Sequence, residues 1–275
     1  MSPSSPSRAI VSLPISCVVI TRDAADRLAA TLGCAAACGE RLVVDSGSTD
    51  ATVAIARNLG ARVEHQPFLG FGPQKRRAVE LAAHDWILSL DADEELDTEA
   101  VRGLATLDLS DPERCWAWRR RTFIGGRELR HGPWGHERVL RLFNRTRSGF
   151  TAHRVHERVD GATRPLLAAG SILHHSFSGC ADVILRSARY AGPKAAILRD
   201  RAESSPAWML PIRALAVFTK SYGLQGGWRD GAAGFVVALS RVVDSTLPRA
   251  IVSVDPPPAP SSSPPADRPD ALPPR

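Results

Sequence analysis

The sequence predicts an α/β fold in which a mostly parallel sheet is flanked by helices and followed by a helical C-terminal extension. Three observations lead to this prediction. Short apolar runs alternate with helical stretches over the first hundred residues, acidic or small polar residues follow those runs, and long helical stretches return near the end of the chain. At 275 residues the chain can bury a full hydrophobic core without staples.

The first hundred residues define an order of strands and helices. Apolar runs predict strands at 16–20, 41–44, 61–64 and 86–90, and the stretches between and after them predict helices at 24–37, 51–59, 74–83 and 99–107. The helix at 51–59 follows Thr49 and Asp50, either of which can cap it. Connections this short need right-handed crossovers between parallel strands, so a Rossmann-like, doubly wound half sheet is expected.

The rest of the chain changes pattern twice. Alternating strands are expected at 116–118, 139–143 and 154–159, and helices at 181–201 and 211–243. The expected domains are a disordered N-terminus (1–13), an α/β domain (14–175), a helical extension (176–250) and a disordered Pro/Ser-rich tail (251–275).

The later helices mix Arg with aromatic side chains. The aromatic residues are Trp208, Phe218, Tyr222, Trp228 and Phe235. This composition suits either an anionic membrane surface or packing against the α/β domain.

The positive charge is concentrated in one segment. Residues 112–160 contain twelve arginines and no lysine against five acids, a net charge of +7, while the whole chain carries +6. Arg binds phosphate and carboxylate through paired hydrogen bonds, so an anionic substrate is one explanation. The other is compositional, because the chain has only three lysines: Lys75, Lys194 and Lys220. A nucleic-acid partner is not expected, since no reading helix, zinc finger or interleaved aromatic signature is recognisable.

Cysteine usage and hydropathy favour a reducing, cytosolic setting. The five cysteines are an odd number, and Cys34 and Cys38 have no second pair to complete a zinc site. No apolar run approaches the roughly 20 residues needed to cross a bilayer. The stretch 9–20 contains Pro14 and leads to no small-residue cleavage site, so it is interpreted as the first strand and not as a signal peptide.

Two carboxylates, Asp91 and Asp93, directly follow the apolar run 86–90. Ligands of open α/β sheets bind at the carboxyl ends of such strands. Hard oxygen ligands there suit Mg²⁺ or Mn²⁺, and a divalent ion suits a diphosphate. The alternative is a solvated acidic turn over 93–97 that favours the start of the next helix.

A third carboxylate, Asp45, directly follows the strand at 41–44 and precedes the small-residue loop Ser46 to Thr49. A carboxylate there can accept hydrogen bonds from a nucleoside, while Gly47 and Ser48 allow close backbone approach. The alternative is an ordinary strand-to-helix turn with an Asx or Ser cap. The dinucleotide and P-loop glycine patterns are both missing.

Four segments resemble the successive motifs of inverting family 2 glycosyltransferases of GT-A fold. They are Ser16–Thr21, Val43–Thr52, Gly70–Lys75 and Trp86–Glu94. Three later segments resemble the branch that contains bacterial lipopolysaccharide core glucosyltransferases: Val139–Phe143, Val155–Glu157 and Leu173–Phe177. The resemblance covers about residues 14–245 and implies that residues 14–175 are a GT-A catalytic domain.

The resemblance also implies roles for residues of the donor site. Asp45 matches the nucleobase-binding aspartate, Asp91 the carboxylate near the ribose, and Asp93 the carboxylate that holds the metal on the donor diphosphate. Gln74 and Lys75 match positions that contact donor nucleotide or phosphate. The remaining expected donor contacts are Thr21, Asp23, Gly47, Ser48 and Ala92. The chain departs from the branch at two points, with Asp23-Ala24 in place of Asn-Glu and Arg76 in place of Asn, which bears on donor affinity.

Inverting transfer needs a base for the acceptor hydroxyl and a cation for the departing diphosphate. Glu137 resembles the family's acidic base, with Arg138 where a second acid is common, and Glu157 is the reserve base. Glu137 as a surface acid paired with a neighbouring Arg is the alternative. His156 could complete the metal shell with Asp93 and Asp91. A second candidate is His175, next to His174, and each of these histidines can equally be a structural strand residue.

The expected function is inverting transfer of a hexose from a nucleotide sugar, with UDP as the expected nucleotide and Mg²⁺ or Mn²⁺ as the expected ion. The expected acceptor is lipopolysaccharide core or another lipid-linked glycan of the cell envelope. The expected location is the cytoplasm, either free or peripheral at the cytoplasmic face of the inner membrane. Two alternatives stay open: a metal-dependent nucleotidyltransferase, or a non-catalytic nucleotide-sugar binder on the same fold. The oligomeric state is not predicted.

Overall fold

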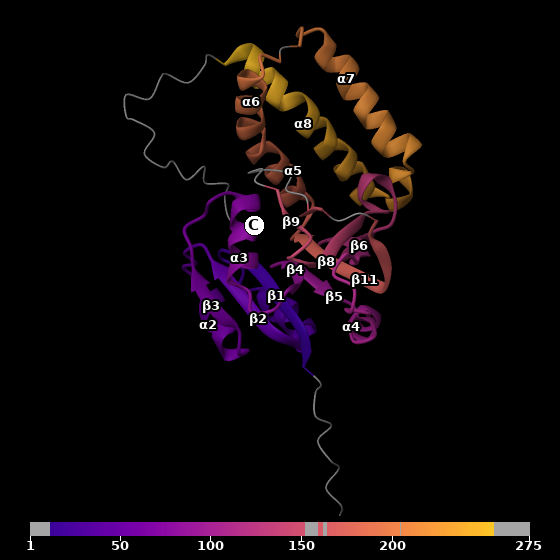
Figure 1. The fold of residues 1–275 in the computed structure, drawn as a ribbon. Helices are drawn as coiled ribbons and strands as arrows, with labels where there is room; N and C mark the ends of the chain where they lie inside the picture. Colours follow the sequence, from indigo (N-terminus) through magenta and orange to yellow (C-terminus); the bar gives the residue numbers. More distant parts are fainter. Residues whose placement is uncertain (1–11, 152–158, 162–163, 204, 256–275) are drawn as a thin grey trace, which may run out of the picture. The chain divides into compact units, whose positions relative to one another are not determined.

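The computed structural model describes residues 12–151, 159–161, 164–203 and 205–255 (Figure 1). The predicted disordered tails fall mostly outside these ranges. Within them the chain forms two compact units. The sheet unit contains the residues up to Trp118 together with Val139–Ile172, and the helical unit contains Arg119–Arg138 and the residues from Leu173 onward. The domain boundaries expected from the sequence stay a prediction.

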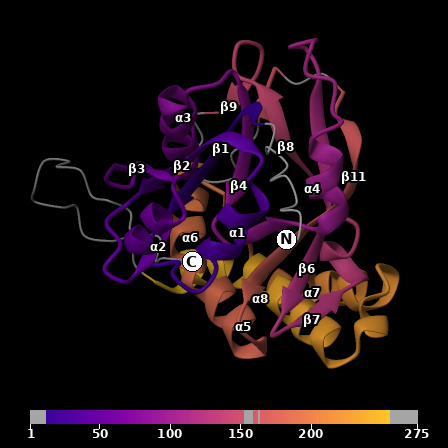
Figure 2. The ribbon, with the colours of Figure 1, turned by 90° about the horizontal axis from the view of Figure 1, so that it is seen from below.

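The sheet unit begins with alternating strands and helices, as expected. Its elements are β1 (Leu13–Thr21), α1 (Leu28–Cys34), β2 (Cys38–Asp45), α2 (Thr52–Asn58), β3 (Arg62–His65), α3 (Phe71–Leu81), β4 (Trp86–Asp91), β5 (Glu94–Leu96) and α4 (Thr98–Leu104). Neighbouring strands run in the order β3-β2-β1-β4, and all three pairings are parallel. This is the order of a doubly wound half sheet, and Figure 2 shows the same strands from below.

Apolar side chains cover both faces of the half sheet because successive residues of a strand point to opposite sides. On one face, Cys17 and Val19 of β1 belong to a cluster with residues of α1, α2 and α4. On the other face, Val18 belongs to a cluster with Ala78 and Val79 of α3. All six residues of β4 are buried, which explains why its sequence is continuously apolar up to Asp91.

The sheet continues beyond β4 with strands from later in the chain. These are β8 (Arg138–Asn144), β6 (Cys115–Ile124) and β11 (Leu166–Phe177), followed by β5. β8 pairs antiparallel with β4, so the sheet is mixed. A separate small hairpin joins β9 (Gly149–Phe150) to β10 (Val159–Asp160). Of the strand expected at 154–159, only Val159 lies within the described residues.

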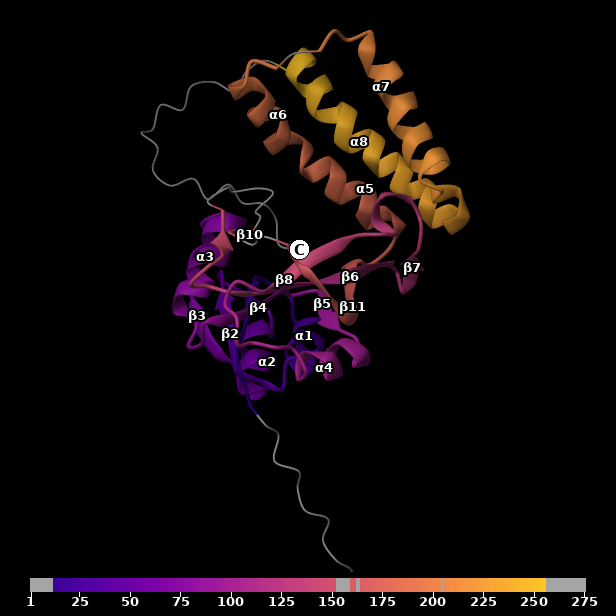
Figure 3. The ribbon, with the colours of Figure 1, turned by 45° about the vertical axis from the view of Figure 1, so that its right-hand side comes forward.

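The helical unit combines a strand hairpin with helices from the later part of the chain (Figure 3). Its elements are the ends of β6 and β11, β7 (Arg127–Leu129), η1 (Gly132–Trp134), α5 (Cys180–Arg189), α6 (Ala191–Asp200), α7 (Met209–Phe218), η2 (Thr219–Leu224), η3 (Gly227–Asp230) and α8 (Ala232–Val254). Its apolar core contains Ile124, Leu129, Val183, Ala233 and Val237. In Figure 1, α8 runs between α6 and α7.

The expected single helix over 181–201 is two helices that meet at Tyr190. Pro193 lies in the first turn of α6, where its missing N–H is tolerated, whereas in the interior of one long helix it would clash with the carbonyl of Arg189. The expected helix over 211–243 is also interrupted. Gly226 (φ 74°) and Gly231 (φ 61°) adopt left-handed or related conformations that end helical runs before α8 begins.

The last helix, α8, continues to Val254, beyond residue 250, where the Pro/Ser tail was expected to begin. Among the described residues, no helix is both long enough and apolar enough to cross a membrane.

Candidate active site

The strands of the parallel half end at one edge of the sheet, and their register brings the predicted donor-site residues together. His65 at the end of β3 lies opposite Asp45 at the end of β2, which lies opposite Thr21 at the end of β1. On the other side of β1, Asp91 at the end of β4 lies opposite Ile20. Adjacent strands are only about 4.8 Å apart, so this carboxyl edge concentrates polar groups within a few residues' width.

The buried Asp45 carboxylate turns back into the loop that follows β2. Its Oδ2 accepts hydrogen bonds from the backbone N–H groups of Gly47 (2.9 Å) and Ser48 (3.0 Å), and its Oδ1 accepts one from the Ser48 hydroxyl. His65 Nδ1 lies 4.0 Å from Oδ2. Asp45 therefore shapes its own loop, as the turn interpretation expected, while a carboxylate still has lone pairs for a further donor.

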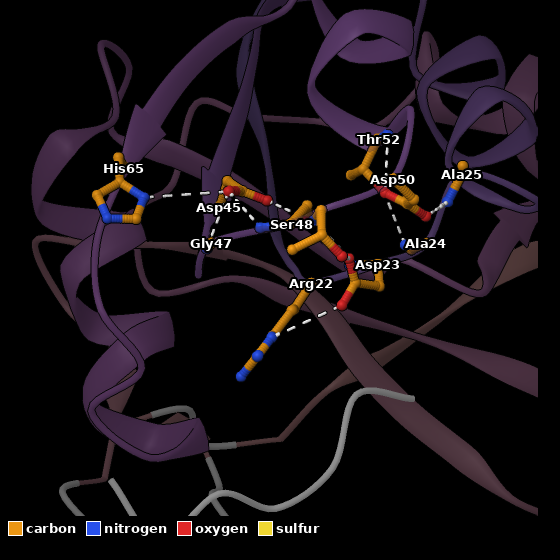
Figure 4. Close-up of polar contacts among 11 residues, drawn as sticks. Arg22, Asp23, Ala24, Ala25, Asp45, Gly47, Ser48, Asp50, Thr52 and His65 are labelled. Atoms are coloured by element: carbon orange, nitrogen blue, oxygen red, sulfur yellow. Dashed lines mark hydrogen bonds and ion pairs between the residues drawn. The ribbon is translucent and has the colours of Figure 1, made fainter.

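Hydrogen bonds tie the loop after β1 to the loop after β2 (Figure 4). They run from Asp23 N to Ser48 Oγ (2.9 Å), from Thr49 N to Asp23 Oδ1 (2.7 Å), from Ala24 N to Thr52 Oγ1 (2.8 Å) and from Ala25 N to Asp50 Oδ2 (3.1 Å). Asp50 Oδ1 also accepts a bond from Thr52 N (2.9 Å) at the start of α2. The N-cap position itself is occupied by Ala51, so neither Thr49 nor Asp50 stands there, but Asp50 bonds the first residue of the helix.

Asp23 has a φ of 49°, in the left-handed region that few side chains adopt. Asp and Asn tolerate this region best because their short polar side chains bond the local backbone. The departure from Asn noted at this position is therefore conformationally conservative. Either residue can hold the turn and accept a hydrogen bond from Thr49 N.

The Thr21 hydroxyl is buried at the carboxyl edge and has no hydrogen-bond partner among the described residues. Its backbone carbonyl accepts a bond from Ser46 N (2.9 Å), which joins the two loops once more. Buried hydroxyls without partners are uncommon in folded proteins. Thr21 is thus a polar group that a bound ligand could satisfy.

Gln74, an expected donor contact, is fully buried and braces the neighbouring loops. Its Nε2 donates to Ser46 Oγ (3.1 Å) and Gln66 O (3.1 Å), and its Oε1 accepts from Leu69 N (3.2 Å). The side-chain amide thus positions the loop after β2. A direct contact between Gln74 and a donor stays a prediction.

Lys75 and Asp91 belong to a buried network of two cations and two anions. Lys75 Nζ lies 2.9 Å from Asp91 Oδ1, and Arg141 NH2 lies 2.9 Å from Asp91 Oδ2. Arg141 also binds Glu94 in bidentate fashion, through Nε to Oε2 (2.7 Å) and NH2 to Oε1 (2.7 Å). The four formal charges cancel. Each Asp91 oxygen therefore already faces a cation.

Sequence reasoning missed Glu94, Arg141 and His65 as members of this region. Arg141 did carry a signal, because it is a charged residue inside the apolar strand of β8 and would be buried there only with a partner. Glu94 was hidden among the acids that follow Asp93. His65 could have been found only from the register of β3.

Asp93 lies in the turn between β4 and β5 and is partly buried. The carbonyl of the preceding Ala92 accepts a hydrogen bond from Thr31 Oγ1 (2.9 Å), which anchors that turn to α1. Within the described residues, no three His, Cys, Asp or Glu side chains group closely enough to hold a metal ion. The predicted ligand His156 and the reserve base Glu157 lie outside the described residues.

Glu137, the predicted base, belongs to the helical unit. Its Oε2 accepts hydrogen bonds from Arg120 Nε (3.1 Å) and NH2 (2.5 Å). Its Oε1 makes no hydrogen bond within the described chain. The partner of Glu137 is therefore an arginine on a neighbouring strand, while the adjacent Arg138 is exposed.

The two adjacent histidines of β11 have separate surroundings. His174 is buried and shares a hydrogen bond with the Ser176 hydroxyl. His175 stacks on Phe123, with ring centroids 4.7 Å apart. These contacts favour structural roles for both, and metal binding by His175 stays a prediction.

Most arginines of the basic segment form ion pairs within the fold. Those paired with acids include Arg114, Arg120, Arg121, Arg130, Arg141, Arg145 and Arg147. The net charge of the segment thus overstates the number of arginines available to an anionic substrate.

Comparison with known proteins identifies the class to which this fold and edge of polar residues belong. The family model described as glycosyl transferase family 2 matches residues 16–163, more than half of the chain. The chain therefore belongs to glycosyl transferase family 2, and it is a glycosyltransferase. Family membership and the observed sheet confirm the predicted GT-A type α/β fold with its helical C-terminal extension.

Two relatives cover most of the chain. One is the lipopolysaccharide core biosynthesis glycosyltransferase LpsC of Rhizobium meliloti, 28% identical over 86% of this chain and 91% of the relative. The other is an uncharacterized glycosyltransferase of Rickettsia felis, 30% identical over 81% of this chain and 83% of the relative. The predicted resemblance to lipopolysaccharide core enzymes is confirmed at this level.

Solved structures are more distant. A glucosyl-3-phosphoglycerate synthase from Mycobacterium tuberculosis, in complex with Mn²⁺, UDP and glucosyl-3-phosphoglycerate, is 21% identical over 45% of this chain and 52% of that chain, with a TM-score of 0.33. A likeness of this size carries no conclusion about ligands of the present chain.

Proposed function

We propose that this glycosyltransferase transfers a hexose, with inversion, from a UDP-linked sugar to lipopolysaccharide core or another lipid-linked envelope glycan. The observation that carries the proposal is the register of the half sheet, which gathers Thr21, Asp45 and Asp91 at one edge. Its acceptor class rests on the relative from Rhizobium meliloti. The family assignment favours this reading over the nucleotidyltransferase and the non-catalytic binder.

The donor nucleotide would lie along the carboxyl edge. Asp45 retains acceptor capacity for a base N–H, and the Thr21 hydroxyl is buried there without a partner in the described chain. Gly47, with φ of 91°, allows the backbone of the loop to approach a ligand closely. Asp23 and Ser48 hold this loop in place and would act on the donor through it.

The diphosphate would lie near Lys75 and Asp93. The residues present fit a divalent ion, because Mg²⁺ is commonly held by one or two carboxylates together with substrate phosphates and does not need an all-protein cage. Asp93 would hold the ion, which when bound supplies positive charge to the leaving diphosphate. Asp91 forms ion pairs with Lys75 and Arg141. We therefore propose that its main role is to position these two cations, and not to bind the metal directly.

The acceptor hydroxyl would lose its proton to Glu137. Its Oε1 is available, while Arg120 fixes the carboxylate through Oε2. A base held in one orientation needs less reorganisation when the acceptor arrives. The reaction would take place at the cytoplasmic face of the inner membrane.

A nucleotide-sugar panel with and without Mn²⁺ tests the proposal. UDP-hexose should raise the melting temperature and be turned over only with a divalent ion, and Asp93→Ala should lower kcat/KM by about 100-fold or more. Asp26→Ala removes an exposed carboxylate in the loop after β1 and should keep full activity. Metal-independent transfer, or equal loss in both variants, would contradict the mechanism.

A further inference from the structure

The helix α7 is almost entirely apolar, yet none of its residues is fully buried. Nine of its ten residues are apolar, Arg213 being the exception, and none of the ten is buried. Globular helices normally bury their apolar stripe against a core. The packing of α7 within the chain therefore leaves much of its apolar surface exposed.

The exposed side chains share one face of the helix. Trp208, just before α7, and Ile212 and Leu215 within it are spaced four and three residues apart, which places them within one narrow arc. Their exposed fractions are 67%, 58% and 68%. Leu210, Ala214 and Val217 lie on the other side and are partly covered, consistent with the packing of α7 against α8.

The apolar surface extends past the end of α7. Leu224 is 83% exposed and Trp228 is 56% exposed in the turns that follow. Phe235 of α8, which is also exposed, contacts the rings of Phe218 and Tyr222 and joins α8 to the same region. We call the exposed set Trp208, Ile212, Leu215, Leu224 and Trp228 the apolar stripe.

Within the stretch of sequence that carries the apolar stripe, the charged residues have one sign. Between Glu203 and Asp230 the sequence has three basic residues, Arg213, Lys220 and Arg229, and no acid. The guanidinium of Arg229 lies over the Trp228 ring, 5.4 Å from its centroid. Asp230, at the boundary of this stretch, is buried and holds His131 (2.9 Å). The stripe therefore presents apolar and basic groups together.

We infer that the apolar stripe inserts into the interface of an anionic lipid bilayer, with the helical unit lying on the membrane. Apolar side chains with tryptophan at the interface, flanked by basic residues and free of acids, match the requirements of interfacial helices. Lys220 and Arg229 flank the stripe, so two copies meeting through it would bring like charges together, whereas an anionic lipid surface would attract them. The inference rests on the proposed function at one point only: the bilayer would be the surface that carries the proposed lipid-linked acceptor.

Vesicle co-sedimentation with the full chain tests the inference. Binding should be strong to vesicles containing phosphatidylglycerol, weak to pure phosphatidylcholine, and reduced by salt. The triple variant Trp208→Ser, Ile212→Ser, Leu215→Ser should bind phosphatidylglycerol vesicles about 10- to 100-fold more weakly. Lys220→Gln with Arg229→Gln should remove most of the lipid selectivity.

A matched control distinguishes binding through the apolar stripe from non-specific binding of exposed apolar side chains. Leu166→Ser with Leu167→Ser alters two leucines of β11 that are 49% and 56% exposed but lie in the sheet unit, and it should leave vesicle binding unchanged. Brominated lipids should quench tryptophan fluorescence in the parent chain and less in Trp208→Phe. Donor-induced thermal shifts, measured on the same preparations, report the proposed function separately.

Two results would overturn the inference. One is failure of a folded, donor-binding chain to bind phosphatidylglycerol vesicles. The other is a dimer in light scattering that the triple variant abolishes while vesicle binding is unaffected, which would assign the stripe to a second copy.

Discussion

At the scale of single residues, the buried network shows how the carboxyl edge of the sheet accommodates buried charge. Asp91 and Glu94 would be costly to bury alone, and Lys75 and Arg141 offset that cost in pairs. Removing one member leaves an opposite charge without its partner. Single substitutions in the network are therefore expected to be strongly destabilising.

Glu94→Gln should lower the free energy of unfolding by about 3 kcal/mol because Arg141 loses its bidentate carboxylate. The midpoint of urea unfolding should fall with an unchanged slope. Glu80→Gln, which breaks an exposed pair with Arg77 on α3, should cost less than about 1 kcal/mol. Equal losses in the two variants would mean that burial of the network contributes nothing.

Asp23 offers a second residue-scale prediction. Asp23→Asn should keep the left-handed turn and its bond from Thr49, whereas Asp23→Ala should lose both and cost about 1–2 kcal/mol. Because the turn braces the loop after β2, calorimetry should show weaker UDP binding for the Ala variant only. Similar UDP affinities for Asp23→Asn and Asp23→Ala would show that the turn at Asp23 does not affect UDP binding.

At the scale of elements, Glu40 joins several strands away from the carboxyl edge. Its carboxylate accepts bonds from Ser16 of β1 (2.5 Å), from Arg62 of β3 (2.9 Å) and from the Ala83 N–H after α3 (2.6 Å). Partial burial alone would raise the pKa of Glu40, but these hydrogen bonds together outweigh it and lower the pKa. The folded state thus favours the ionised carboxylate.

Glu40→Gln should destabilise the protein at neutral pH, and the difference from the parent should shrink in acid. A lowered folded pKa gives stability that is present above the unfolded pKa and is lost as the pH falls through the folded value. The loss should therefore begin near the ordinary value of 4.5 and grow below it. Thermal unfolding of both proteins from neutral to acidic pH checks this, and a pH-independent difference would contradict it.

At the scale of the whole molecule, the cysteines differ sharply in accessibility. Burial raises the pKa of Cys34 to about 11 and that of Cys38 to about 12, and it also raises the pKa values of Cys17 and Cys115. Cys180 is exposed at the start of α5. Since the thiolate is the reactive form, the folded chain should present one reactive cysteine.

Iodoacetamide at neutral pH should therefore add one carbamidomethyl group to the native protein, at Cys180, and five after unfolding. Intact-mass measurement and peptide mapping count and locate the groups, with Cys180→Ser as the control. Rapid native labelling of Cys34 or Cys38 would show that the region around α1 opens.

The sheet unit was predictable because its signals are local. Buried strands such as β4 have continuous apolar runs, and short connections leave few topologies. The position of Asp91 followed directly. The helix break before Pro193 could also have been predicted from the sequence, since proline disfavours an interior position.

The side-chain partners at the site were not predictable in the same way. Arg141 meets Glu94 across 47 residues of sequence, and only the pairing of β8 with β4 brings them together. The resemblance places Gln74 at the donor, but its position in the motif does not show that its amide also bonds Ser46, Gln66 and Leu69. The partner of Glu137 proved to be Arg120, which likewise depends on strand pairing.

The pairing of β8 beside β4 also sets an order of events during synthesis. At about 5–20 residues per second, the ribosome makes Asp91 and Glu94 roughly 2–10 s before Arg141, their later counter-ion. Until then β4 has no antiparallel neighbour on that side. Asp91 has Lys75 from earlier in the chain as its cation, whereas Glu94 still lacks the guanidinium of Arg141. The nascent half sheet can thus form its parallel strand order early. Its buried charge network is complete only after β8 has left the ribosome.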